Sequence, residues 1–235
     1  MNRTRLGKGI LTAATVGALA FTLAACSSGS NDGVGTDNNT KAPSASSSTK
    51  AVPDATATIA KLGGKDTQVT LDQGFLDALG SLKLTPGTLG TAKLDGATLS
   101  FPITGGNVKY WDPSLDYRPY VQGEIDHDGS GISLTGGGKT VELSDFVIDP
   151  GSNSKLTGTV KVDGKEVGTD VNIFRLDGTT LNPLTKDADG NAVLEGTTVY
   201  ISQDAAKLLN DTFGTDAVTG DLKVGIAKIT AAPAQ

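Results

Sequence analysis

From Thr56 onward the sequence consists of short runs rich in β-branched residues, and glycine, aspartate or asparagine separates one run from the next. Apolar and polar residues alternate within the runs, as in 156–162 and 198–201. Alternation with a period of two is typical of strands that bury one face. The sequence therefore predicts a mainly β fold, an antiparallel β-sandwich-like domain, and its 31 glycines fit the many turns of such a fold.

Asp-Gly pairs predict where some of these strands are joined. Asp163-Gly164 lies between two β-type runs, an arrangement typical of a two-residue hairpin turn. The same pair recurs at 95–96 and 177–178, in less regular surroundings. We therefore expect a hairpin at 163–164 and similar turns at the other two positions.

A strand–helix–strand pattern occurs twice, first at 69–73 and again 130 residues later, at 199–203. In each copy a strand runs into a helix-capping residue, a short amphipathic helix, a residue that favours helix ends, and a second strand. These features are Asp72, Gly80 and 90–94 in the first copy, and Ser202, Asn210 and 225–229 in the second. The pattern predicts two short α-helices in repeated units, although similar local chemistry without a true repeat would look the same.

The only cysteine, Cys26, follows a basic stub and an uncharged, mostly apolar run over 10–23, and small polar residues come after it. This order is typical of an export signal, and the run is too short to span a membrane. The residues Leu-Ala-Ala-Cys at 23–26 resemble the lipobox of bacterial lipoproteins. The resemblance implies cleavage between Ala25 and Cys26, a lipid on the sulfur, and anchoring at the extracytoplasmic face of the cell membrane. An ordinary secretory signal with a chance cysteine is the alternative.

The expected organisation is a signal peptide at 1–25, a lipidated flexible linker at 26–55, and a single β-rich domain at 56–232. The linker is rich in small polar residues, which cannot bury enough surface to offset the entropy of ordering. Residues 1–25 hold three of the 20 Lys and Arg residues and none of the 26 Asp and Glu residues, which leaves a net charge of −9. Such acidity argues against nucleic acid as a partner.

The only histidine, His127, lies between Asp126 and Asp128 in a stretch rich in glycine. Flanking carboxylates favour its charged form and predict a raised pKa. Its functional interpretation is a haem or metal ligand, and a solvated turn is the alternative. Asp126 and Asp128, like Asp187 and Asp189, are spaced two apart beside a turn glycine, as in calcium loops. Neither pair completes the calcium-loop pattern, and tight β-turns explain both.

Aromatic residues concentrate within eleven positions, at Tyr110, Trp111, Tyr117 and Tyr120. The prolines at 113 and 119 break regular structure there, so we expect a loop. Tyrosine and tryptophan on a loop suit a ligand-contact surface, and we expect these four residues to form one. The alternative is a loop that folds back over the sheet as a lid on the core.

The order of elements from Phe75 onward resembles the HtaA-type haem-binding domain of actinobacterial surface proteins. The similar segments are 121–134, which contains His127 before a strand, 147–150, 156–160 and 199–206, which precedes a helix. The resemblance implies a mostly β fold with two short helices, haem as a candidate cofactor and His127 as its ligand. The family carries an axial tyrosine three residues after its phenylalanine, and Ala78 occupies that position here.

Catalytic signatures are weak in this sequence, because it has no Gly-x-Ser-x-Gly motif and no glycine-rich phosphate loop with a lysine. We therefore expect a non-catalytic binding or interaction module of the cell envelope whose ligand the sequence does not name. Haem capture through His127 is the first alternative. A hydrolase of envelope polymer is the second, because carboxylate pairs are plentiful.

Overall fold

The computed structural model describes residues 51–235, and the segment Thr49–Gln235 forms a compact unit of its own. The predicted signal peptide, the lipidation site at Cys26 and most of the predicted linker lie outside the described residues. Within 51–235 the helices are too short to cross a membrane. The domain boundaries at 25 and 55 stay predictions.

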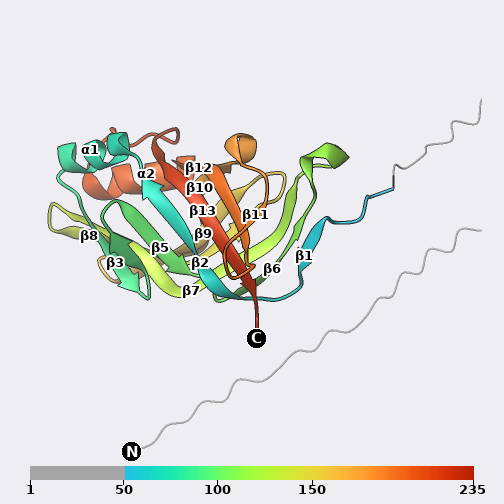
Figure 1. Ribbon diagram of the computed structural model, residues 1–235. Helices are drawn as coiled ribbons and strands as arrows, with labels where there is room; N and C mark the ends of the chain where they lie inside the picture. The colour runs from blue at the N-terminus through green and yellow to red at the C-terminus, as the bar shows by residue number, and fades with distance from the viewer. Residues whose placement is uncertain (1–50) are drawn as a thin grey trace, which may run out of the picture. The chain divides into compact units, whose positions relative to one another are not determined.

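Strands make up most of the described chain, and thirteen of them join into one antiparallel sheet (Figure 1). In chain order the strands are β1 (Ala57–Ile59), β2 (Leu62–Leu71), β3 (Thr85–Gly90), β4 (Lys93–Asp95), β5 (Thr98–Pro102), β6 (Gly105–Tyr110), β7 (Val121–Gly136), β8 (Lys139–Asp149), β9 (Lys155–Val162), β10 (Lys165–Asp177), β11 (Thr185–Lys186), β12 (Ala192–Ile201) and β13 (Lys223–Pro233). Their order across the sheet is β1-β6-β7-β8-β9-β10-β12-β13-β2-β5-β4, while β3 pairs with β7 and β11 pairs with β12. The predicted mainly β, antiparallel, sandwich-like fold with two short helices is confirmed.

The two α-helices are α1 (Gln73–Ser81) and α2 (Gln203–Phe213), and single 3₁₀ turns occur at Pro113–Leu115 and Gly178–Thr180. The predicted capping residues are confirmed. The carboxylate of Asp72 accepts a hydrogen bond from the backbone N–H of Gly74, and the hydroxyl of Ser202 accepts one from that of Ala205. Each cap satisfies an N–H group that the first helical turn would otherwise leave unpaired.

The two strand–helix units lie beside each other in the sheet. Strands β2 and β12 are both antiparallel to β13, which separates them, so they run in the same direction. Each strand leads directly into its helix, and both helices therefore lie at the same end of the sheet (Figure 1). The predicted strand at 225–229 falls within β13.

The predicted helix ends and the strand at 90–94 are wrong. Helix α1 includes Gly80, and α2 continues past Asn210 to end before Gly214, whose φ of 67° is left-handed. The side chain of Asn210 instead exchanges two hydrogen bonds with the backbone of Val218, which holds the loop after α2. Residues 91–92 interrupt the expected strand, because β3 pairs with β7 whereas β4 pairs with β5.

Of the three predicted turns, one is confirmed, one lies one residue later than expected, and one is wrong. Asp163-Gly164 joins β9 to β10 with positive φ at both residues, 51° and 76°, the conformation that a two-residue hairpin requires. The hairpin between β4 and β5 is present, but its turn residues are Gly96 and Ala97, because Asp95 ends β4 and pairs with Thr98. Asp177 instead accepts a hydrogen bond from the backbone N–H of Thr179 and caps a 3₁₀ turn, so the third hairpin is wrong.

The glycine-rich segment around His127 is not a turn, so the solvated-turn interpretation of this histidine is wrong. Strand β7 continues through it, with a bulge between the pair His127–Phe146 and the next pair, Gly131–Ser144. Gly129, with φ of 70°, lies within the bulge, where a left-handed conformation favours glycine. The bulge lets one long strand bend while His127 keeps an inward-facing position.

The sheet folds over, so that β2 and β5 face β7 and β8. Thr67 of β2 and Phe101 of β5 are cross-strand neighbours, and so are His127 of β7 and Phe146 of β8. Between the two pairs, Oγ1 of Thr67 lies 2.8 Å from Nε2 of His127, and the phenylalanine rings meet edge to face at 5.3 Å. All four side chains are buried. We call these four residues the cross-sheet cluster.

The chain itself crosses between the two facing parts of the sheet just after β5. The backbone N–H of Ile103 donates to the carbonyl of Lys65 in β2, and that of the next residue, Thr104, donates to the carbonyl of Asp126 in β7. Consecutive residues are thus hydrogen-bonded to opposite parts of the sheet. The connection between β5 and β6 therefore holds the two parts of the sheet next to each other at this point.

We expect the cross-sheet cluster to couple the two parts of the sheet energetically. In a double-mutant cycle, Phe101→Leu and Phe146→Leu should show a coupling of about 0.5–1.5 kcal/mol in the free energy of unfolding, because an edge-to-face ring pair contributes that much beyond burial. Chemical denaturation of the single and double variants measures it. Pairing Phe101→Leu with Phe213→Leu, on α2, is the control and should give a coupling near zero. Equal couplings in the two cycles would contradict the assignment.

Candidate functional site

An apolar cavity of about 670 Å³ lies between the facing parts of the sheet. Its walls come from many strands and include Val69, Ile125, Ile148, Leu156, Phe174 and Val199. Protein interiors hold few voids larger than a water molecule, whereas sites for small molecules usually measure about 300–1,000 Å³. The cavity is therefore the feature of the fold that most resembles a binding site.

Small side chains at inward positions of β13 leave room for this cavity. Ala227, Ile229 and Ala231 alternate along the strand and all line it. On β12 the lining residues Leu194 and Thr197 are separated by a bulge, which shifts the inward positions by one residue. Alanine and threonine thus occupy positions at which larger aliphatic side chains would fill the space.

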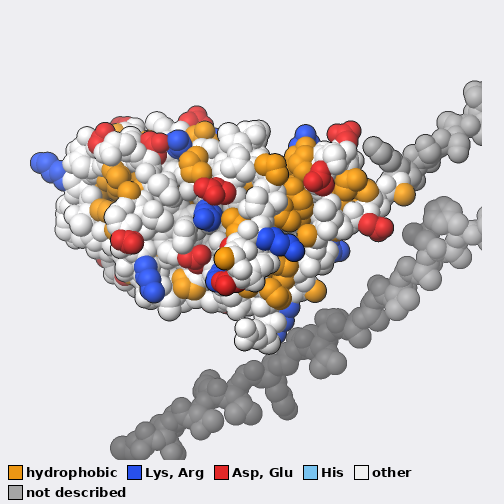
Figure 2. All heavy atoms as spheres, viewed as in Figure 1, with side chains coloured by type: hydrophobic (Ala, Val, Ile, Leu, Met, Phe, Trp, Pro, Cys, Tyr) orange, Lys and Arg blue, Asp and Glu red, His pale blue; other side chains and the backbone are white. Residues whose placement is uncertain are grey.

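Part of the cavity lining reaches the surface on β6 and just before β11, and we call this part the mouth of the cavity. Hydrophobic side chains gather on this face of the molecule, right of centre in Figure 2. Val108 of β6 and Leu184, just before β11, are among the half-buried lining residues there. The backbone N–H of Leu184 donates to the hydroxyl of Tyr110 over 3.5 Å, which links the two sides of the mouth.

His127 lies in the cavity wall but is itself only 1% exposed. Its Nδ1 lies 3.2 Å from the carbonyl oxygen of Phe146, which can only accept, so Nδ1 carries the proton. Nε2 then accepts from the hydroxyl of Thr67. Both ring nitrogens therefore have protein partners, and the imidazole is neutral.

The expected raised pKa of His127 is wrong. Burial lowers it to about 4, because the charged form loses its hydration. The hydrogen bond with the carbonyl of Phe146 and the charge of Asp128 offset only part of this effect. Asp126 and Asp128 alternate with His127 along β7, which directs them to the other face of the strand. Burial, and then repulsion from Asp128, raises the pKa of Asp126.

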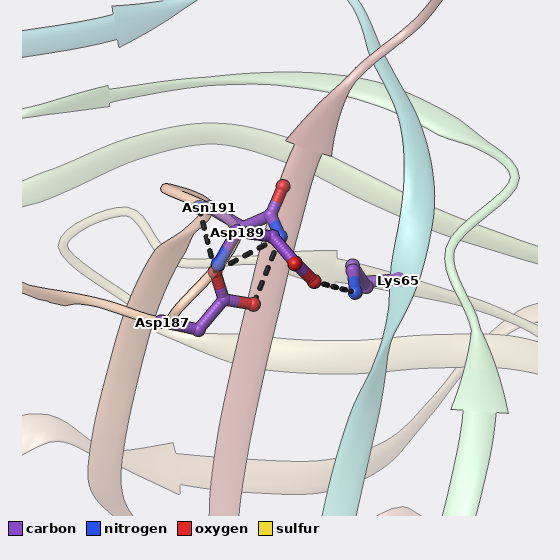
Figure 3. A network of polar contacts seen from close by, with 4 residues as sticks. All are labelled: Lys65, Asp187, Asp189 and Asn191. Carbon is purple, nitrogen blue, oxygen red and sulfur yellow. Dashed lines mark hydrogen bonds and ion pairs between the residues drawn. The ribbon is translucent and has the colours of Figure 1, made fainter.

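The second pair of aspartates closes the turn between β11 and β12 (Figure 3). The carboxylate of Asp187 accepts hydrogen bonds from the backbone N–H groups of Asp189 and Asn191 and from the Asn191 amide, and these bonds lower its pKa. The carboxylate of Asp189 lies 3.0 Å from Nζ of Lys65 on β2. Donors of the protein itself thus contact the carboxylates of Asp187 and Asp189, which agrees with a tight turn rather than a calcium loop. No group of three or more metal-binding side chains occurs within 51–235.

The aromatic segment is divided by the structure into buried and part-exposed residues. Trp111 is buried, donates from Nε1 to the carbonyl of Pro53 over 2.9 Å, and packs against the ring of Tyr117. Tyr110 is also buried, and both it and the half-buried Tyr120 line the cavity. This arrangement corresponds to the lid alternative for Tyr110 and Trp111, and only Tyr117 and Tyr120 keep part of their surface exposed.

Arg118, which the sequence analysis did not single out, lies at the exposed rim of the cavity. Its guanidinium group lies over the ring of Tyr120, 3.9 Å from the ring centre. Within the described residues no carboxylate is closer than 4.0 Å to it. A short arginine–proline–tyrosine segment between two strands carries no local signal of a cavity, so the sequence alone gave no reason to choose it.

Known proteins show a distant structural similarity. No protein-family model and no curated protein matches this sequence. The crystal structure of the C-terminal domain of HtaA from Corynebacterium glutamicum is similar at a TM-score of 0.49 and 17% identity, over 72% of this chain and 98% of that one. The crystal structure of a domain-swapped dimer of the H434A variant of that domain is similar at a TM-score of 0.44 and 18% identity, over 65% of this chain and 87% of that one.

We expect the neutral, buried His127 to make the fold acid-sensitive. Below pH 6.5 the unfolded chain binds a proton that the folded chain excludes until about pH 4, so stability is complete above pH 6.5 and falls across this window. The loss at pH 5 relative to pH 7 should be about 2 kcal/mol. Urea denaturation at both values measures it.

His127→Gln is the control for this pH dependence, because the chain has no other histidine. The variant should lose stability at pH 7 but show a much smaller difference between pH 7 and pH 5. Carboxylates with a lowered pKa, such as that of Asp187, contribute equally to the pH dependence of stability in the unmodified protein and in the variant. An unchanged pH dependence in the variant would contradict the assignment to His127.

Proposed function

We propose that this protein is a non-catalytic binding protein that holds an apolar small molecule in the cavity between the facing parts of its sheet. The observation that carries the proposal is the cavity itself, about 670 Å³ with largely aliphatic and aromatic walls. Filling such a space restores the contacts that its walls otherwise lack. We expect a ligand to enter at the mouth, where side chains of the lining are only half-buried.

The cross-sheet cluster supports a role without catalysis. The hydroxyl of Thr67 and the imidazole of His127 have the spacing of a nucleophile and its base. A histidine with a pKa of about 4 is, however, a weak base at neutral pH, and both groups are almost completely buried. The pair therefore serves structure, and an envelope-polymer hydrolase gains no support from it.

We further propose that the protein works at the extracytoplasmic face of the cell membrane, anchored through a lipid on Cys26. The Leu-Ala-Ala-Cys sequence and the export-like segment before it support this location. The net negative charge supports a role that does not involve nucleic acid. A membrane-proximal position would bring the cavity close to a source of apolar molecules.

Haem is a second candidate ligand, because the cavity is large, apolar and has His127 in its wall. Direct ligation by Nε2 of His127 would require the imidazole to give up its hydrogen bond from Thr67 and to move out of the wall. The structure thus favours an apolar ligand without a metal bond to this histidine.

N-phenyl-1-naphthylamine, a neutral probe that fluoresces in apolar surroundings, tests the proposal on the compact unit 49–235. We expect saturable binding at one site per chain. Val199→Phe places a ring into the cavity and should weaken binding about tenfold or more, since the added ring occupies the site. Thermal unfolding checks that the variant remains folded.

Absence of saturable binding, or binding that Val199→Phe leaves unchanged while the variant is folded, would contradict the proposed function. Haemin in place of the probe tests the second candidate. A Soret shift that is lost in His127→Gln, while probe binding is retained, would support haem ligation by His127. A shift that survives the substitution would contradict it.

A further inference from the structure

The charged side chains on the cavity lining indicate the chemical class of the ligand, an inference that rests on the proposed function. The lining has three charged residues in addition to the neutral His127, namely Arg118, Arg175 and Asp177. Their local partners differ. What each one contacts decides which of them is available to a ligand.

Two of the three charges already have partners. The carboxylate of Asp177 accepts hydrogen bonds from the backbone N–H and the hydroxyl of Thr179, at 2.9 and 2.7 Å, and these bonds lower its pKa. The guanidinium of Arg175 lies over the ring of Tyr200, 4.3 Å from the ring centre, and 3.6 Å from the carboxylate of Asp221. Both groups are engaged by neighbouring residues of the fold.

Arg118 differs from Arg175 in having no carboxylate within 4.0 Å among residues 51–235. The ring of Tyr120, itself part of the cavity wall, supports its guanidinium from one face. Stacking on an aromatic face uses none of the guanidinium N–H groups, so they remain able to donate. A planar fork of donors held at an apolar rim matches a carboxylate or a phosphate.

The interior of the cavity offers no comparable anchor for a polar group. The two nitrogens of His127 are bonded to Thr67 and to the carbonyl of Phe146, and most other walls are aliphatic or aromatic. Apart from hydroxyls such as that of Thr197, the interior provides few partners for a polar group that loses its hydration there. The buried part of a ligand should therefore be hydrocarbon.

We propose that the ligand is an amphiphile with a hydrocarbon chain in the cavity and an anionic head group, a carboxylate or a phosphate, at Arg118. The chain is bound by burial of apolar surface, and the head group by charge-assisted hydrogen bonds from the guanidinium at the rim. The ligand should therefore have one orientation, with its chain against the apolar walls inside and its head group at Arg118 on the rim.

Displacement of N-phenyl-1-naphthylamine from the unit 49–235 tests this assignment. The competitors are dodecanoate, dodecyl phosphate and dodecyltrimethylammonium, each used below its micelle concentration. They share one chain, so the differences between them report on the head group. We expect at least one anionic competitor to displace the probe at about fivefold lower concentration than the cation.

Arg118→Gln should abolish this preference while the probe still binds, and Arg175→Gln, at the other lining arginine, should retain it. Whichever anion is preferred identifies the head group as a carboxylate or a phosphate. Equal displacement by anions and cation, or a preference that survives Arg118→Gln, would overturn the inference and leave the proposed function standing. Failure of the probe itself to bind would instead contradict the proposed function.

Discussion

The contact between Thr67 and Phe101 on one side and His127 and Phe146 on the other determines how the sheet folds over. A buried hydrogen bond and an edge-to-face ring pair join residues that are neighbours within each part of the sheet. Because the hydrogen bond requires neutral imidazole, the cluster makes a histidine part of the core at the cost of acid sensitivity. The cavity is the space that this closure leaves between the remaining strands.

Local chemistry explains why the fold class, both helix caps and the hairpin at 163–164 were predictable from sequence. The helix ends were not, because α2 extends past Asn210, whose side chain instead binds Val218 in the following loop. A solvated turn was one interpretation of the segment around His127, since its aspartates and glycines are typical of turns. The alternation of Ile125 and His127 with Asp126 was nevertheless a strand pattern, and a bulge accommodates the glycines.

The candidate site was much harder to predict than the fold, because its walls come from strands far apart in the sequence. Alanines at 227 and 231 become informative only when the register of β13 shows that they face inward. The aromatic segment was a partial guide. It led to Tyr110 and Tyr120, which line the cavity, but Trp111 is buried against Pro53, and Arg118 between them was overlooked.

The proposed function requires that an open apolar cavity persist between the facing parts of the sheet. Crystals of the unit 49–235 under xenon pressure test it most directly, because xenon enters dry apolar cavities. We expect xenon density between Val69, Phe101 and Val199, with the cross-sheet cluster intact. A structure in which side chains have collapsed into this space, with no xenon bound there, would contradict it.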